Sequence, residues 1–227
     1  MKLKRSVYAF KGESGSGKTL AAQMFLCIAH KVTNSFEYFN EHKDFIEPFS
    51  FGSSLKCFLS DALNIPFDCF FNEQYKDDYF LKLPEMSFAN KLSDFEHIYT
   101  VQDFLENNGL NGINGYTKLR YVMQYFGTEL VKNKFWSKAW INQAFYYFSD
   151  NASYVIDDCR FKDESDAVYE KGGVCIRVIR KKEFLNKYKH SSEQIYEDNR
   201  DIIIMNDGTE EDLFNKIKKL VEDERIA

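Results

Sequence analysis

The sequence predicts an α/β fold in which helices cover both faces of a mostly parallel sheet of about five strands. Two patterns support this fold class. Short apolar runs alternate with segments of helical period, and a glycine-rich turn joins the first apolar run to the first helical segment. The 227 residues are 44% hydrophobic, which is enough to bury a sizeable core and excludes wholesale disorder. We therefore expect a single domain of alternating strands and helices.

The individual elements follow from these patterns in chain order. Strands are expected where short apolar runs lie between turns, and helices where apolar residues recur at helical spacing. Gly172 and Gly173 would end one helix, and Thr209 would cap the last. The expected strands cover residues 7–10, 153–157, 174–179 and 201–205. The expected helices cover residues 19–31, 51–64, 117–131, 136–148, 161–171 and 210–224.

Residues 36–116 do not follow this alternation. The segment is rich in Phe, Tyr, Asn, Asp and Lys, and it ends in the turn-rich sequence NNGLNGING at residues 107–115. We expect it to form an inserted lobe rather than an independent domain. Aromatic residues make up 17% of the chain, and most of them are expected to pack in the core and in this lobe. The phenylalanines that crowd its first part are Phe45, Phe49, Phe51, Phe58, Phe67, Phe70 and Phe71.

Charge and hydropathy argue against several functional classes. With 30 basic and 35 acidic side chains the net charge is −5, which argues against binding to a nucleic acid polymer. No apolar run approaches the ~20 residues of a membrane span, and the charged start of the chain lacks the apolar core of a signal peptide. The five cysteines are odd in number and form no CxxC pair, so neither disulfides nor a zinc site are expected. These features favour a reducing compartment, the cytoplasm.

A phosphate-binding motif follows the first expected strand. The sequence GESGSGKT at residues 12–19 matches the pattern G-x-x-x-x-G-K-[ST] in full. Glycines let backbone N–H groups converge on phosphate oxygens, and the following helix adds the positive end of its dipole. Lys18 would reach the β and γ phosphates of ATP or GTP, and the Thr19 hydroxyl would coordinate Mg²⁺. The predicted nucleotide-binding residues of this loop are Gly12, Glu13, Ser14, Gly15, Ser16, Gly17, Lys18 and Thr19.

Further polar clusters accompany the expected elements of the second half. They are TKLR at residues 117–120 with Gln124 and GTE at 127–129, Trp140, DDCRF at 157–161, GGV at 172–174, HSSE at 190–193 and NDGT at 206–209. An earlier segment, SFGSSLK at residues 50–56, stands with them. Together with the phosphate loop, this set resembles the deoxynucleoside monophosphate kinases of tailed bacteriophages. The resemblance covers residues 7–31, residues 50–64 and the chain from residue 117 onward.

The resemblance implies a P-loop kinase that transfers the γ-phosphoryl of ATP to a deoxynucleoside monophosphate (dNMP), giving ADP and a deoxynucleoside diphosphate, with Mg²⁺ as cofactor. It implies that residues 36–116 bind the acceptor and that residues 180–199 form a basic lid over ATP. The catalytic residues implied are Lys18, Arg120, Asp158, Arg160 and Arg180. The acceptor-binding residues implied are Lys56, Arg120, Gln124, Gly127, Thr128, Trp140, Asp158 and Arg160, with Asn206 at the adenine. A dNMP is then the partner, with no nucleic acid polymer and no membrane, and a homodimer and a location in the host cytoplasm are further expectations.

Elementary geometry supports part of this assignment and leaves alternatives open. Arg120 and Gln124 are four positions apart and share a helix face, where a guanidinium would clamp a phosphate and an amide would read a base edge. Trp140 would stack on the base. The alternatives are a solvated helix face for Arg120, a surface position for Gln124, core packing for Trp140, a surface salt bridge for Asp158 and Arg160, a solvated loop for residues 180–199 and a plain helix cap for residues 206–209.

The chain also departs from the family pattern in places. Glu13, Ser14 and Ser16 stand where some members carry basic residues, and no proline precedes Arg120. Gly52 replaces an alanine. Two other functions are kept as alternatives: a small-molecule kinase acting on another phosphate or hydroxyl, such as dephospho-coenzyme A, and a non-kinase module that binds ATP to control a partner.

Overall fold

The computed structural model describes residues 3–30, 45–70, 76, 80–82, 116–149, 152–180 and 196–224. The chain divides into two compact units. The first unit comprises Met1–Ser53 and Lys138–Ala227, and the second comprises Ser54–Ser137. Each unit is described by itself. In the described part of the chain, no helix is both long and apolar enough to cross a membrane.

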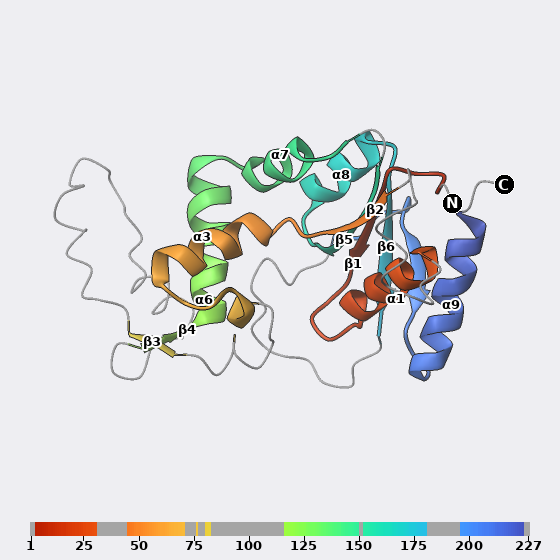
Figure 1. Cartoon of the computed structure of the whole chain (residues 1–227), viewed down its shortest axis with the longest axis horizontal. Helices are drawn as coiled ribbons and strands as arrows, with labels where there is room; N and C mark the ends of the chain where they lie inside the picture. Colours follow the sequence, from red (N-terminus) through yellow and green to blue (C-terminus); the bar gives the residue numbers. More distant parts are fainter. Residues whose placement is uncertain are drawn as a thin grey trace. The chain divides into compact units, whose positions relative to one another are not determined.

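A five-stranded sheet forms the centre of the first unit (Figure 1). In spatial order its strands are β2 (Phe45–Phe49), β5 (Ala152–Cys159), β1 (Val7–Lys11), β6 (Val174–Ile179) and β7 (Ile202–Met205). All neighbouring strands pair in parallel. The central strand β1 is buried along its whole length, which explains why its first four residues, VYAF, are apolar or aromatic; its last residue is Lys11.

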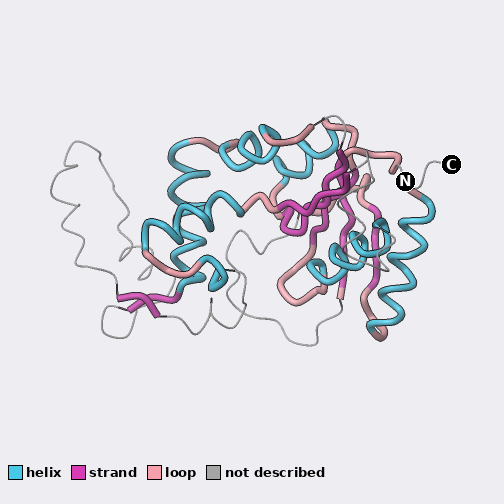
Figure 2. Tube along the Cα trace, in the orientation of Figure 1, coloured by secondary structure: helices cyan, strands magenta, loops and turns pink. Residues whose placement is uncertain are grey.

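Helices cover both faces of this sheet (Figure 2). Because side chains alternate along a strand, Phe10 of β1 packs on one face and Ala9 on the other. The helices on the face of Phe10 are α1 (Lys18–His30) and α9 (Glu210–Asp223), and those on the face of Ala9 are α7 (Ala139–Tyr146) and α8 (Lys162–Glu170). The predicted three-layer α/β architecture is confirmed.

The predicted strands agree with four strands of the five-stranded sheet, but its fifth strand was missed, as was the short pair β3 (Phe80–Lys82) and β4 (Tyr116–Lys118) of the second unit. β2 falls inside residues 36–116, which were expected to form the inserted lobe. Pro48 lies within this strand and lacks the N–H that a ladder needs, so the run does not read as a strand. β2 is an edge strand, where proline is tolerated. The second compact unit, Ser54–Ser137, accordingly begins and ends later than the expected lobe.

The second unit is built mainly from helices. Its described elements are α3 (Ser53–Leu63), which begins at the boundary between the units, the 3₁₀-helix η1 (Phe67–Phe70), the antiparallel pair β3 (Phe80–Lys82) and β4 (Tyr116–Lys118), α6 (Leu119–Gln124) and the π-helix η4 (Tyr125–Phe135). Leu55 and Leu59 form the buried side of α3. Leu55 approaches Gly127 of η4 so closely that a Cβ there would lie 2.7 Å from the leucine Cδ2. The glycine therefore allows α3 and η4 to pack together.

The prediction of a single helix over residues 117–131 was wrong. The structure has a strand up to Lys118, six residues of α-helix and then eleven residues of π-helix. The π-helical bonding is visible at its end, where the Trp136 N–H donates to the Val131 carbonyl at 2.9 Å. Over so short a segment, the spacing of apolar residues does not distinguish i→i+4 from i→i+5 hydrogen bonding. The sequence pattern could therefore not reveal the change from α-helix to π-helix.

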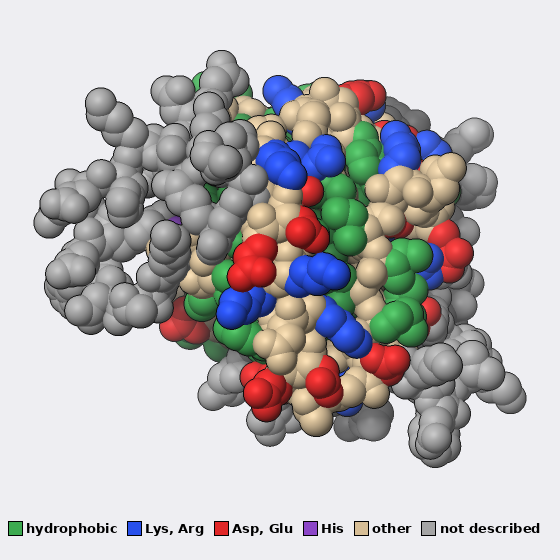
Figure 3. Space-filling view, turned by 90° about the vertical axis from the view of Figure 1, so that its right-hand side faces the viewer, with side chains coloured by type: hydrophobic (Ala, Val, Ile, Leu, Met, Phe, Trp, Pro, Cys, Tyr) green, Lys and Arg blue, Asp and Glu red, His purple; other side chains and the backbone are tan. Residues whose placement is uncertain are grey.

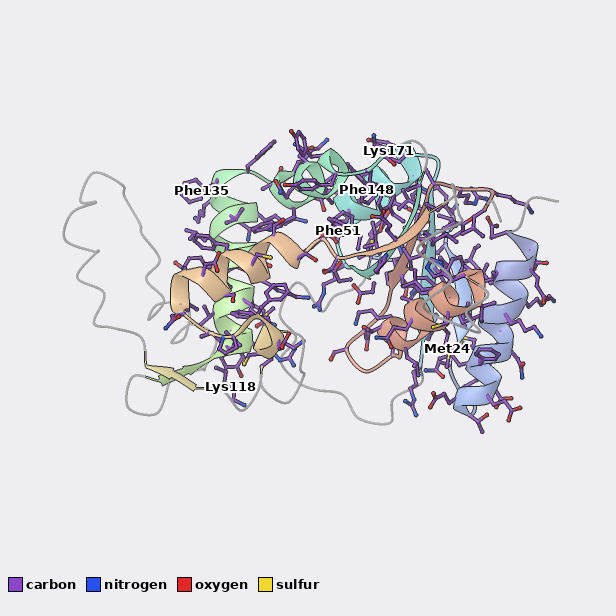
Figure 4. All side chains as sticks on the ribbon, in the orientation of Figure 1. Met24, Phe51, Lys118, Phe135, Phe148 and Lys171 are labelled. Carbon is purple, nitrogen blue, oxygen red and sulfur yellow. The ribbon has the colours of Figure 1, made fainter. Side chains whose placement is uncertain are left out.

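Aromatic side chains fill much of the core beside α7 and α8. Phe148 stacks on Tyr154 with ring centroids 3.7 Å apart, and Phe51 is buried in the same cluster (Figure 4). The predicted internal packing is confirmed for Phe51 and Phe70, whereas Phe58 and Phe67 are exposed. The side chains of Phe45 and Phe71 lie outside the described residues.

The outer surface carries both signs of charge. On the face drawn in Figure 3, acidic and basic side chains are interspersed rather than segregated. Along α9, Glu210, Glu211 and Asp212 occupy the first turn, where the helix dipole favours negative charge. On this face, therefore, the described charged side chains do not form a patch of a single sign.

Candidate active site

The phosphate loop connects the end of β1 to the start of α1. The Ser16 N–H donates to the Glu13 carbonyl at 3.0 Å, which closes the turn. Gly15 and Gly17 have φ values of 73° and 90°, in the left-handed region that favours glycine. Because β1 lies in a parallel sheet, the loop occupies the carboxyl edge of the strands, where ligands bind in open α/β sheets.

The loop has the shape that a polyphosphate requires. A Cβ at Gly12 would lie 2.5 Å from the Val178 carbonyl oxygen, and a Cβ at Gly17 would lie 2.5 Å from Asn206 Nδ2. Among the described residues, the buried Ser16 hydroxyl has no hydrogen-bond partner. The first N–H groups of α1 have no partner within the helix and form an anion site at its start. The residues of the loop therefore fit the phosphates of a nucleoside triphosphate.

Lys18 and Thr19 open α1 beside this loop. Lys18 Nζ lies 3.5 Å from the Glu13 carbonyl, so the ammonium curls back over the loop. Thr19 is exposed. In the described ranges, no three His, Cys, Asp or Glu side chains are grouped to hold a metal. The donor set at a P-loop is different, since the ion is held by one hydroxyl together with phosphate oxygens and water, and Thr19 fits that arrangement.

Asn206 supports the loop from the end of β7. Its side-chain Nδ2 donates to the Ser16 carbonyl at 2.8 Å, and its N–H donates to the Ile179 carbonyl at 2.7 Å. The amide is buried, and its contact is with the protein backbone. The cap expected nearby is made by Thr209, whose hydroxyl accepts from the Asp212 N–H at 3.1 Å. Asn206 thus braces the phosphate loop, a role that the sequence analysis did not foresee.

Asp158 lies near the end of β5 and holds the turn that leads into α3. Its carboxylate accepts hydrogen bonds from the Ser50 hydroxyl at 2.5 Å, the Phe51 N–H at 2.7 Å and the Gly52 N–H at 2.9 Å. Both carboxylate oxygens are thereby used. The Ser53 N–H donates to the Ser50 carbonyl at 3.1 Å and closes the same turn, so Asp158 has a positioning role there.

Arg160 and Arg180 follow β5 and β6 at the same edge of the sheet as Lys18. The backbone N–H groups of Arg160 and Phe161 donate to one oxygen of Glu164 at 2.8 and 3.0 Å. This carboxylate fixes the backbone where β5 enters α8. The structure therefore brings Lys18, Asp158, Arg160, Arg180 and Asn206 to the carboxyl edge of the sheet.

A second group of predicted residues belongs to the second unit. Lys56 lies on α3, Arg120 and Gln124 on α6, and Gly127 and Thr128 within η4. Arg120 and Gln124 are both half-buried, whereas Gly127 and Thr128 are buried. These residues all belong to the second unit, and the structure does not fix where they lie relative to the phosphate loop.

Trp140 and the basic segment complete the predicted set. Trp140 is half-buried on α7 and packs against the core cluster that contains Phe51 and Ile141. This contact favours the core-packing alternative, and base stacking by Trp140 stays a prediction. Residues 181–195, which include the HSSE sequence and most of the expected lid, lie outside the described residues.

One buried ion pair was missed by the sequence analysis. Lys11 Nζ lies 2.8 Å from Asp201 Oδ2, and the two side chains are 1% and 0% exposed. The available signal was a lysine that ends an apolar strand directly before Gly12. Nearby, the hydrogen bond to Cys175 and burial together hold the pKa of the Cys159 thiol well above its usual range.

Comparison with known proteins places this site in a family. The family model described as deoxynucleotide monophosphate kinase matches residues 55–217, which is more than half of the chain but begins after the phosphate loop. The deoxynucleotide monophosphate kinase of Escherichia phage RB69 is 32% identical over 143 residues, or 59% of this chain and 58% of that protein. The enzyme of the same name from Enterobacteria phage T4 is 30% identical over 114 residues, or 48% and 47%. The chain thus spans about half the length of the curated relatives it matches. On the strength of the family match, this chain belongs to the deoxynucleotide monophosphate kinase family.

Proposed function

We propose that the protein transfers the γ-phosphoryl group of ATP to a dNMP, releasing ADP and a deoxynucleoside diphosphate. The observation that carries the proposal is the phosphate loop, in which Gly12 and Gly17 leave no room for a Cβ and Asn206 holds the Ser16 carbonyl, in a chain of this kinase family. The relatives from phages RB69 and T4 are named as deoxynucleotide monophosphate kinases. Their names support the choice of acceptor.

In the proposed reaction, an oxygen of the acceptor phosphate forms a bond to the γ phosphorus, and the bond from the γ phosphorus to the β,γ-bridging oxygen breaks. Lys18 binds the β and γ phosphates, and the loop N–H groups hold them in place. A Mg²⁺ ion bound with ATP would supply neutralising charge, with the Thr19 hydroxyl as its protein ligand. The acceptor phosphate is already an anion, so the chain needs no general base.

The remaining candidate residues are assigned roles unit by unit. Arg160 and Arg180 lie at the sheet edge and would balance the charge that develops on the transferring group. Arg120 and Gln124 share α6 and would bind the acceptor phosphate and base. Asp158 acts through the turn at Ser50, because its carboxylate is occupied by that turn. A homodimer and a location in the host cytoplasm stay predictions.

A coupled assay of ADP release tests the proposal. The purified chain is given ATP, Mg²⁺ and each of the four common dNMPs, and a panel of modified pyrimidine monophosphates is added because the accepted base is open. We expect turnover with at least one dNMP well above the rate without acceptor. If no dNMP raises ADP release above that background, the proposal fails.

The same assay with further acceptors, together with a titration of ATP binding, addresses the two alternatives. A small-molecule kinase would release ADP with another acceptor, such as dephospho-coenzyme A, and not with dNMPs. A nucleotide-binding module would bind ATP tightly and show no acceptor-dependent release. No contact among the described residues favours either alternative over a dNMP kinase.

A further inference from the structure

Lys11 connects the phosphate loop to a distant part of the chain. It is the last residue of β1 and directly precedes Gly12. Besides the contact with Asp201 at 2.8 Å, its Nζ donates to the Tyr196 carbonyl at 3.0 Å. Lys11 therefore ties the end of β1, directly before the loop, to residues 196–201, which lead into β7.

The carboxylate of Asp201 is fully engaged. Its Oδ1 accepts from the Tyr169 hydroxyl at 2.8 Å, and its Oδ2 accepts from the Asp198 N–H at 3.2 Å in addition to the lysine. Burial and the hydrogen bond to Asp201 raise the pKa of the Tyr169 hydroxyl, so this phenol stays protonated and donates to the carboxylate. The pair is thus a completed buried network and not an isolated charge.

The segment that carries Asp201 is itself fixed to the first unit. Arg177 of β6 pairs with Glu197, and Arg200 pairs with Asp166 of α8 at 2.9 Å. Arg200 also lies over the Tyr169 ring, 4.0 Å from its centroid. These contacts attach the segment that carries Asp201 to β6 and α8.

Stability alone does not explain why an ion pair stands here. Replacing a buried ion pair by apolar residues of similar volume is often neutral or stabilising, so an apolar residue at each position would fill the site as well. An ion pair instead imposes one geometry, because its hydrogen bonds are directional. A fixed geometry at Lys11 would hold the backbone in one conformation where β1 enters the phosphate loop.

We propose that Lys11 and Asp201 form a positioning pair that fixes the start of the phosphate loop for nucleotide binding. The proposal rests on the nucleotide binding in the proposed function but not on the identity of the acceptor. Neither residue touches the nucleotide. Lys11 holds the backbone before Gly12, and Asp201 holds Lys11.

Equilibrium binding of ADP and urea unfolding test this proposal in parallel. The key variant is the double substitution Lys11→Met and Asp201→Leu, which removes the pair and keeps the site apolar and filled. We expect its urea midpoint to recover to near that of the wild type, while its Kd for ADP is raised about tenfold. Lys11→Met alone leaves Asp201 without its cation and is expected to lower the midpoint and raise the Kd. Wild-type Kd in a double variant of wild-type midpoint would overturn the proposal.

A second variant covers the case in which the double variant does not fold. Asp201→Glu keeps the charge and lengthens the side chain, so the pair persists with altered geometry. We expect a folded protein whose Kd for ADP is raised about threefold or more; an unchanged Kd contradicts positioning. Lys219→Met is the control, because Lys219 is an exposed lysine of α9 outside this network, and the Kd of this variant should equal that of the wild type. ADP binding is measured without acceptor, so a failure of dNMP turnover would leave this test intact.

Discussion

The side-chain amide of Asn206 donates to the carbonyl oxygen of Ser16 at 2.8 Å and joins the end of β7 to the middle of the phosphate loop. Both groups are buried, so the contact is shielded from water. The loop is therefore braced by a strand that is separated from β1 by β6. This relationship leads to the first prediction.

Asn206→Ala is expected to weaken nucleotide binding. The substitution leaves a buried carbonyl without its donor, which costs about 1–3 kcal/mol and corresponds to a rise of about fivefold to 150-fold in the Kd for ADP if the whole loss falls on the loop. Calorimetric titration with ADP measures the Kd of the variant and of the wild type. Asp207→Ala is the control, because Asp207 pairs with Lys216 on the exposed surface and should bind ADP normally. Equal affinities of the two variants would show that the brace has no effect.

Gly17→Ala is expected to abolish nucleotide binding. The residue has a φ of 90°, and the new Cβ would lie 2.5 Å from Asn206 Nδ2, so strain and a clash act together. Gly172→Ala is a suitable control, since Gly172 has a φ of 71° with nothing within 4 Å of the added Cβ. The control should lose about 1–2 kcal/mol of stability from backbone strain alone and keep its affinity. The measurements are urea unfolding and ADP titration of both variants.

Residues with a local signal were predictable from the sequence. The glycine spacing at residues 12–19 specified the loop, and apolar runs specified β1, β5, β6 and β7, because each of these features depends on neighbouring residues only. β2 was missed because its proline is acceptable only at a sheet edge, which is a property of the tertiary structure.

The missed contacts share a physical cause. Asn206 with Ser16, and Lys11 with Asp201, join residues that are far apart in the chain, and neither pair has a sequence spacing that would mark it. The π-helix was missed for a different reason, because its apolar residues keep a spacing that an α-helix also accepts. Long-range polar contacts and helix type therefore need the structure.

Asp158→Asn is expected to destabilise the first unit by about 2–4 kcal/mol, because a charged acceptor of several hydrogen bonds is lost and an amide N–H₂ is placed against backbone N–H groups. Ser50→Ala removes one of these bonds only and should cost about 1 kcal/mol. Chemical unfolding at neutral pH checks both values. If Asp158→Asn unfolds at the wild-type midpoint but loses activity, the carboxylate acts on substrate and not on the turn.

Arg120→Ala is expected to raise the KM for the dNMP by about 10-fold to 100-fold while the KM for ATP stays close to the wild-type value, as is typical of a lost phosphate contact. Steady-state kinetics with each substrate varied in turn gives both constants. Lys134→Ala removes an exposed cation from the same unit and serves as the control. A parallel rise in both KM values in Arg120→Ala would argue for a structural role of Arg120.

The cap of α9 predicts a pH dependence of stability. The Thr209 N–H donates to Asp212 at 2.8 Å, and this bond lowers the pKa of the carboxyl below its usual 3.8. Because the folded pKa is depressed, the stabilisation is fully present above the unfolded pKa of about 4 and is lost as the pH falls through the folded value. Asp212→Ala should flatten the stability profile below that pH, and Thr209→Ala should cost about 1 kcal/mol at neutral pH. Urea midpoints measured across the acid range test this prediction. If the stability profile of Asp212→Ala is the same as that of the wild type, the Asp212 carboxylate does not cause the pH dependence.

The order of strands in the sheet has a consequence for the nascent chain. β1 carries the phosphate loop and is synthesised first, yet its two hydrogen-bonding neighbours are β5 and β6, which emerge from the ribosome much later. Until then its apolar side chains have no sheet to join, and closing such long loops is entropically slow. We therefore expect the phosphate loop to be among the last parts to assemble, because the strand before it is completed only when β5 and β6 are available.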